Sequence, residues 1–187
     1  AAYVVTMKVD AFCVMPLMSL GLAMTTFTGQ NIGAGDIPRV EKGCRQGLLL
    51  TVSITGGLSV LLFFFGKYPL MLFTPEPELL REGMHLLRIL CPFYWVIAVS
   101  DLLTGVMRGS GNTIIPMINS MICLCLIRIP LMYWLVSLFH SADALYYSMV
   151  IGWCVGATFM SLFYKFSPWR RRALEKYQKD QQLLAEK

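Results

Sequence analysis

Five long stretches of apolar residues constrain the fold of this chain more than any other feature. They cover residues 11–35, 46–66, 89–107, 109–139 and 144–164, and only Asp101 and Arg128 place a charge inside them. A helix needs about 20 mostly apolar residues to cross the hydrocarbon core of a bilayer. The stretches are too long and too uniformly apolar for the alternating strands of a membrane barrel. The sequence therefore predicts an all-α integral membrane protein with five transmembrane helices.

Composition excludes several other classes of protein. Hydrophobic residues make up 56% of the 187 residues and charged residues 14%, against roughly 25% charged residues in a typical soluble domain. This argues against a soluble enzyme, a disordered chain and a disulfide scaffold. The six cysteines show no metal-ligand spacing, and no nucleophile elbow, H-E-x-x-H motif or carboxylate pair is present. We expect no enzymatic activity and no metal site.

Basic residues indicate the orientation of the helices. We expect spans at about 4–35, 44–66, 78–108, 113–139 and 143–165, forming one domain (1–166), and a basic tail over 167–187. Eleven Lys and Arg residues share the side of the tail: Arg39, Lys42, Arg45, Arg108, Lys165, Arg170, Arg171, Arg172, Lys176, Lys179 and Lys187. The opposite side carries four: Lys8, Lys67, Arg81 and Arg88. This asymmetry predicts a cytoplasmic tail on a protein of the plasma (inner) membrane, and no nucleic-acid partner.

Five spans place the N-terminus on the outer side. No basic segment, short apolar run or cleavage site precedes the first span, so an upstream segment is expected to carry this end across the membrane. The chain is therefore interpreted as the C-terminal piece of a longer membrane protein. A complete five-span protein with a trimmed N-terminus is the alternative.

Two charged side chains lie inside the apolar stretches. A carboxylate near the bilayer centre costs roughly 2.5–3.5 kcal/mol, so Asp101 is interpreted as a cation or proton site, with a hydrogen-bonded structural acid as the alternative. At about 1.5 Å per residue, Asp101 lies about 10 Å and Arg128 about 22 Å from the cytoplasmic helix ends. This difference in depth argues against a simple ion pair. Arg128 is otherwise expected to extend outward or to bind backbone carbonyls of a kinked helix.

Prolines and glycines mark expected breaks and contacts. Four prolines lie inside spans, where each can kink its helix: Pro16, Pro92, Pro116 and Pro130. Two pairs of glycines have the G-x-x-x-G spacing that lets helices approach closely: Gly105 with Gly109, and Gly152 with Gly156. The glycine-rich segments 29–35 and 105–113 are expected to end their helices with left-handed caps. The region 173–187 is expected to be either a short surface helix or disordered.

Several short motifs recur at definite spacings along the chain. They are MP at 15–16, TGQNIGAG at 28–35, RQG at 45–47, SD at 100–101, GVMRGSGNT at 105–113 followed by Pro116, and RIPL at 128–131 followed by Tyr133. Each is weak alone. Together they resemble the second half of transporters of the MATE (multidrug and toxic compound extrusion) family, across essentially the whole chain.

The resemblance implies a fold and a function. MATE proteins have twelve spans in two six-helix lobes and exchange organic cations and drugs for Na⁺ or H⁺ by alternating access. This chain resembles the eighth to twelfth spans, so its partners would be the lipid bilayer, organic cations or drugs, and the missing N-terminal lobe. Asp101 falls on the position of an acid that helps to bind the coupling cation. An acid of the seventh span lies outside this chain, so the choice between Na⁺ and H⁺ stays open.

Further residues receive roles within this interpretation. Soft apolar surfaces accept varied organic cations, and the substrate cavity is expected to be walled by Phe93, Tyr94, Trp95 and Met107. Structural or gating roles are expected for Arg128, Pro92, Pro116, Pro130, Gly105 and Gly109. No cofactor beyond the coupling ion is expected. The rival functions are a flippase for lipids or lipid-linked precursors in the related superfamily, and a non-transporting membrane scaffold.

Overall fold

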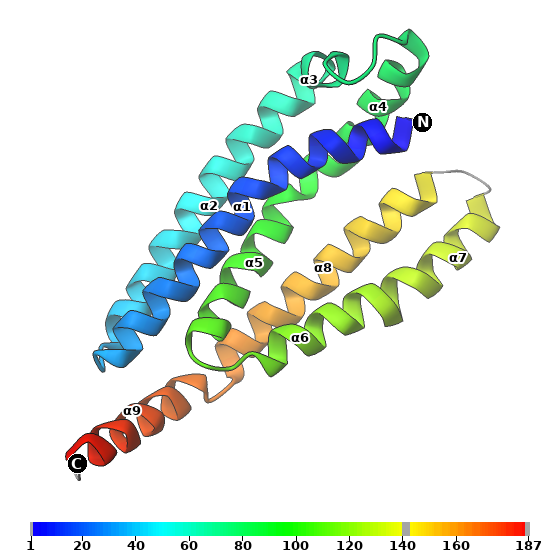
Figure 1. Cartoon of the computed structure of the whole chain (residues 1–187). Coiled ribbons are helices and arrows are strands. Elements are labelled where there is room, and N and C mark those ends of the chain that lie inside the picture. The colour runs from blue at the N-terminus through cyan, green and yellow to red at the C-terminus, as the bar shows by residue number, and fades with distance from the viewer. Residues whose placement is uncertain (1, 140–142, 186–187) are drawn as a thin grey trace.

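The structure, a computed structural model, describes residues 2–139 and 143–185. Within these ranges every regular element is helical (Figure 1). Five helical segments are long and apolar enough to cross a membrane: Val4–Gly33, Ile37–Phe65, Pro77–Gly109, Ile114–Leu138 and Ala144–Phe166. The predicted all-α fold with five transmembrane helices is confirmed.

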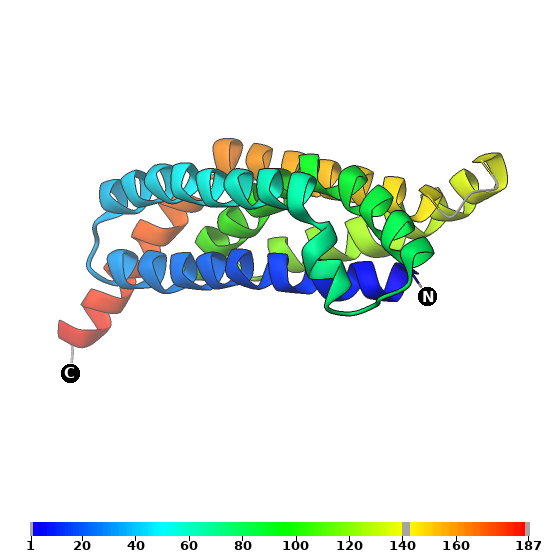
Figure 2. The same ribbon diagram turned by 90° about the horizontal axis from the view of Figure 1, so that it is seen from above.

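Helix α5 (Tyr94–Gly109) lies at the centre of the bundle. It packs against α1 (Ala2–Gly33), α2 (Ile37–Phe65) and α8 (Asp143–Phe166). The fourth span, built from α6 (Ile114–Met121), a π-helical segment η2 (Ile122–Arg128) and α7 (Ile129–Phe139), packs on α8 (Figures 1 and 2). Helices α1, α5 and α8 run in one direction and end at the same end of the molecule, where α9 (Trp169–Ala185) begins (Figure 1).

Two glycine turns of the same design connect spans at that end. Gly35 (φ 76°) follows α1 and Gly111 (φ 83°) follows α5, and a residue with a Cβ rarely adopts this left-handed conformation. The residue after each glycine accepts a hydrogen bond from the first turn of the following helix: Asp36, the N-cap of α2, accepts from the Arg39 N–H (3.0 Å), and the side-chain oxygen of Asn112 accepts from the Ile115 N–H of α6 (3.4 Å). The expected left-handed caps after the first and third spans are therefore confirmed.

The opposite end is built from short helices. After α2, the short helix α3 (Lys67–Met71) reverses the chain, and α4 (Pro77–Leu90) leads back into the bundle. Pro77 starts α4, where its missing N–H costs nothing, and Glu78 lies in the first turn, where a negative charge is favourable. One face of α4 is buried through Leu80, Leu87 and their neighbours, so this helix is amphipathic.

Two of the intramembrane prolines lie at departures from α-helical geometry. Pro92 is the middle residue of a 3₁₀ turn, η1 (Cys91–Phe93), which separates α4 from α5. Pro130 follows the π-helical segment η2 by two residues. Proline provides no backbone N–H for the preceding turn, and both departures are common ways to accommodate that loss. Pro16 and Pro116 lie inside α1 and α6, which continue through them.

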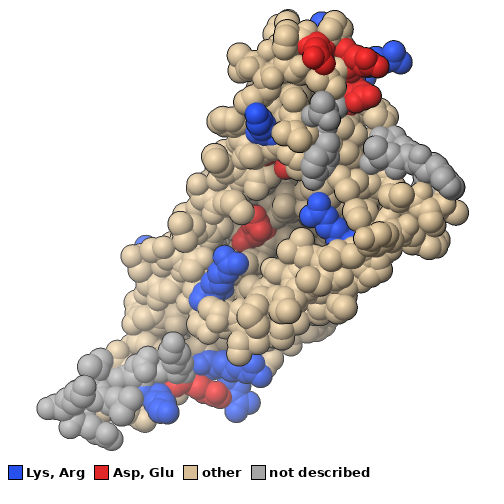
Figure 3. Space-filling view, turned by 45° about the vertical axis from the view of Figure 1, so that its right-hand side comes forward, with Lys and Arg blue, Asp and Glu red and all other residues tan. Residues whose placement is uncertain are grey.

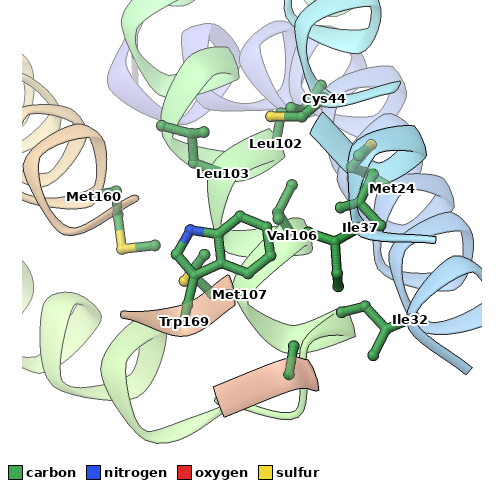
Figure 4. Close-up of a cluster of buried hydrophobic side chains, with 12 residues drawn as sticks. Met24, Ile32, Ile37, Cys44, Leu102, Leu103, Val106, Met107, Met160 and Trp169 are labelled. Atoms are coloured by element: carbon green, nitrogen blue, oxygen red, sulfur yellow. The ribbon is translucent and has the colours of Figure 1, made fainter. Parts of the chain in front are cut away.

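The interior contains two hydrophobic clusters, one towards each end of the bundle. The first joins α1 to α4, α5 and α8 through residues such as Leu87, Leu90, Tyr94 and Tyr146. The second, drawn in Figure 4, includes Met24, Val40, Leu102, Val106, Met107, Met160 and Trp169. Large apolar side chains on the outer faces, including Phe12, Leu49, Phe64, Leu126 and Trp134, are more than half exposed, as lipid-facing residues should be.

The described part of the tail is helical from Trp169 to Ala185, which favours the surface helix over the disordered segment. The first residue of this helix, Trp169, is buried in the second cluster, and its indole N–H donates to the Tyr164 carbonyl (3.0 Å). Arg170 pairs with Glu41 of α2. These contacts fix the start of α9 against the ends of α2 and α8.

Candidate functional site

The helices α1 and α5 touch through their backbones. A Cβ added to Gly105 would overlap the carbonyl oxygen of Gly21, and one added to Gly109 would lie 2.5 Å from the Thr25 carbonyl oxygen. Gly21 itself faces the Asp101 carbonyl oxygen, 3.1 Å from where its Cβ would be. Asp101, Gly105 and Gly109 are spaced by four residues, so they form one stripe on α5 that faces α1.

Asp101 lies on this stripe within the third span. The residue is half-buried, and its Cβ is 3.8 Å from the position that a Cβ on Gly21 would take. Within the described residues its carboxylate makes no hydrogen bond or ion pair. Figure 3 shows a face of the molecule that is hollowed along its middle, with side chains of both charges gathered there. Arg108, further along α5, interacts electrostatically with this carboxylate without forming an ion pair. An acid that is partly exposed and has no direct partner within a span can bind a cation or exchange a proton.

Arg128 lies in the fourth span, and its side chain forms no ion pair with Asp101. It ends the π-helical segment and lines a cavity between α5, the fourth span and α8. Between residues 2–139 and 143–185 no ion pair links the two side chains. The difference in helical depth that argued against a simple pair is therefore consistent with the structure.

In the described part of the chain the four expected substrate-wall residues are divided between the two hydrophobic clusters and the outer surface. Tyr94 is 1% exposed and Met107 is fully buried, each in a different hydrophobic cluster. Phe93 packs against the first cluster, and Trp95 is half exposed on the outside. Phe93 ends the 3₁₀ turn, while Tyr94 and Trp95 begin α5, where consecutive positions point about 100° apart, so Tyr94 and Trp95 face different directions. Tyr94 and Met107 pack the interior in this structure.

The prolines and glycines assigned structural or gating roles also have definite places. Gly105 and Gly109 provide the close contact with α1, while Pro92 lies at the 3₁₀ break. Pro116 is buried in α6, and Pro130 is exposed at the start of α7. The two glycines thus lie where spans touch, and Pro92 lies where the third span departs from α-helical geometry.

Sequence reasoning missed a second intramembrane acid, Asp10 of α1. Its carboxylate accepts a hydrogen bond of 2.6 Å from the Tyr94 hydroxyl, joining α1 to α5 across 84 residues of sequence. The only signal in the sequence was an Asp at the edge of the first apolar stretch, and nothing there identified its partner. Groups of three or more His, Cys, Asp or Glu side chains that could hold a metal ion do not occur in the part of the chain that the structure describes.

We expect the Tyr94→Phe substitution to destabilise the bundle by about 1–3 kcal/mol, because it removes one partner of a half-buried hydrogen bond. The midpoint of thermal unfolding of the full-length protein in detergent would report the change. Tyr133→Phe is the matched control, since Tyr133 is 69% exposed and should change stability by less than about 0.5 kcal/mol. Equal stability of the two variants would show that the bond to Asp10 contributes nothing.

Four spans packed around a fifth, central one that contains an acid without a hydrogen-bond or ion-pair partner in the described residues define a multi-pass membrane protein of the transporter class. The chain belongs to the MatE family, whose model matches residues 1–134. It is 25% identical over 175 residues to "Probable multidrug resistance protein NorM" of Thermotoga maritima, covering 93% of this chain and 38% of that protein. It is 32% identical over 133 residues to "Probable multidrug resistance protein YoeA" of Bacillus subtilis, covering 71% of this chain and 29% of the relative.

Solved structures share the fold. The crystal structure of the eukaryotic MATE transporter AtDTX14 matches with a TM-score of 0.85 at 22% identity, covering 95% of this chain and 40% of that chain. The inward-facing conformation of a multidrug resistance MATE transporter matches with a TM-score of 0.72 at 16% identity, covering 95% of this chain and 39% of that chain. The chain therefore spans about two-fifths of the length of these proteins.

Proposed function

We propose that this chain forms the C-terminal lobe region of an efflux antiporter that exports organic cations or drugs in exchange for Na⁺ or H⁺. The observation that carries the proposal is Asp101: a half-buried carboxylate within a membrane span that has no hydrogen-bond or ion-pair partner in the described residues. Membership of the MatE family and the names of the multidrug resistance relatives support drug export as the process that this acid serves.

In the proposed mechanism, Asp101 alternately holds a coupling ion and is released from it. An ionised carboxylate in a low-dielectric span is stabilised by a bound cation or proton. In this proposal the site binds the ion with different affinity in the inward-open and outward-open states, so ion binding shifts the equilibrium between them. The organic cation binds when the coupling ion has left. The exchange drives rocking of this lobe against the other lobe of the transporter. The protein acts in the plasma membrane, with α9 on the cytoplasmic side.

Reconstituted full-length protein tests this proposal. We expect an ethidium-like dye to move against its concentration gradient when either a Na⁺ gradient or a pH gradient is imposed across the proteoliposomes, with the coupling ion moving in the opposite direction. Imposing the Na⁺ gradient and the pH gradient in separate experiments identifies the coupling ion. If correctly folded protein moves no dye under either gradient, the antiporter proposal is wrong, and a scaffold role would then fit better.

A further inference from the structure

Arg108 lies two helical turns beyond Asp101 on the same face of α5. A step of seven residues turns an α-helix by about 700°, which is within about 20° of two full turns. The helix is continuous from Tyr94 to Gly109, so Arg108 stands above Asp101 at roughly 10 Å along the axis. Side chains on a helix lean towards its N-terminus. The long side chain of Arg108 can therefore reach back towards Asp101.

The guanidinium of Arg108 has no other partner among the described side chains. Arg108 is exposed, and within residues 2–139 and 143–185 it makes no hydrogen bond or ion pair. The helix positions between the two charged residues on this face are Thr104 and Gly105, and neither carries a charge. Arg108 acts on the Asp101 carboxylate through this gap by electrostatics alone, without direct contact.

Other charged or titratable side chains lie on the elements packed against α5. They are Lys8 and Asp10 on α1; Arg39, Glu41, Lys42, Cys44 and Arg45 on α2; Cys91 on η1; Cys123, Cys125, Arg128 and Tyr133 on the fourth span; and Tyr146, Tyr147, Cys154, Tyr164 and Lys165 on α8. Asp10 is bound to the Tyr94 hydroxyl, two turns of α5 away from Asp101. Among the charged residues that the structure describes, Arg108 is the one whose charge acts on Asp101.

We infer that Arg108 sets the affinity of Asp101 for the coupling ion by acting as a built-in competing cation. This inference rests on the proposed antiport function and adds a positioning residue to it. A fixed positive charge near a carboxylate stabilises the ionised, empty form of the acid, and it repels a second cation that arrives there. The coupling ion is therefore held less tightly, and released more readily, than at an isolated acid in a membrane span.

Modification of Asp101 by a hydrophobic carbodiimide tests this inference without an ion gradient. The reagent modifies carboxyl groups in their protonated form, and peptide mass spectrometry of the full-length protein in maltoside reports modification at Asp101, with Asp101→Asn to assign the signal. We expect Arg108→Gln to move the pH midpoint of modification upward and to lower the Na⁺ concentration that protects the acid. Each affinity should rise roughly 5- to 30-fold, the effect of removing one unit charge about 8 Å away at an effective dielectric constant of about 20–40.

Two variants separate charge from structure. Arg108→Lys keeps the positive charge and should keep most of the behaviour of the unchanged protein. Lys165→Gln is the matched control, because Lys165 is an exposed basic residue in the last turn of α8, as Arg108 is in the last turn of α5, but its charge does not act on Asp101. This control should leave the modification profile unchanged.

Transport kinetics provide a second measurement. In proteoliposomes Arg108→Gln should lower the concentration of driving ion that gives half-maximal dye export by a similar factor. The maximal rate should fall as well, because the ion leaves more slowly. Damage to the structure would lower the maximal rate alone.

The outcomes are distinguishable. An unchanged modification profile in Arg108→Gln, an equal shift in Lys165→Gln, or equal shifts in the Gln and Lys variants of Arg108 would overturn the inference. If Arg108→Gln does not fold, Arg108→Met gives the same test with a neutral side chain that keeps the apolar stem. A shifted profile in a protein that exports no dye would support the effect of Arg108 on Asp101 and contradict the antiporter proposal; ion-driven export with an unshifted profile would do the reverse.

Discussion

Replacing Asp101 with asparagine should abolish ion-driven efflux while leaving the protein folded. The amide has the size of the carboxylate but replaces one acceptor oxygen with an NH₂ donor, and it carries no charge with which to hold Na⁺ or to take up and release H⁺. The substrate would still enter, yet ion binding could no longer shift the equilibrium between the two open states. Dye export by proteoliposomes under an imposed ion gradient measures the effect, and we expect export at the background rate of protein-free vesicles.

Glu82→Gln is the matched control for this experiment. Glu82 is an exposed acid of α4, so its substitution also removes one negative charge but should leave export unchanged. Unfolding curves of Asp101→Asn and of the unchanged protein should agree within about 0.5 kcal/mol. Full efflux by Asp101→Asn would refute the role proposed for this acid.

The second large effect is expected at the contact between α1 and α5. Gly105→Ala places a methyl group where the Gly21 carbonyl oxygen now lies. Because that atom belongs to the backbone, the two helices must separate, and overpacking of this kind costs about 1–3 kcal/mol. The midpoint of thermal unfolding in detergent should fall, and ion-driven export should fall with it, since Asp101 lies on the same stripe of α5.

Gly57→Ala shows whether the effect depends on the contact. Gly57 lies in α2, and a Cβ there would meet nothing within 4 Å. Alanine is favoured over glycine inside a helix by about 0.5–1 kcal/mol, so this variant should be as stable as the unchanged protein or slightly more stable. A similar loss of stability in both variants would show that the glycine contact has no special importance.

Much of the fold could be predicted from sequence because the bilayer restricts the choices. Backbone polar groups in hydrocarbon must be satisfied within the protein, so long apolar stretches are helices. The turns at Gly35 and Gly111 could also be predicted from the sequence, because a glycine followed by Asp or Asn is a local signal that needs no tertiary information. Asp101 could be singled out for the same reason: a charge in an apolar stretch is costly wherever its partner lies.

The parts of the fold and of the candidate site that could not be predicted depend on which helix faces pack against each other. The hydrogen bond between Asp10 and Tyr94, and the burial of Met107 in one cluster with Trp169, join segments far apart in sequence. A run of three aromatic residues such as 93–95 indicates an apolar environment, but it does not show which of the three rings faces the interior. The π-helical segment ending at Arg128 has only Pro130 as a sequence signal, and most helices accommodate a proline with an ordinary kink.

The common direction of α1, α5 and α8 has an electrostatic consequence. Their peptide dipoles place three partial negative charges at the end of the molecule where α9 starts, and the N-termini of α2 and α6 at the same end offset two of them. Arg108 lies in the last turn of α5 and Lys165 in the last turn of α8. These two basic residues therefore interact favourably with the C-terminal dipoles of their own helices, in addition to any attraction they have for lipid headgroups.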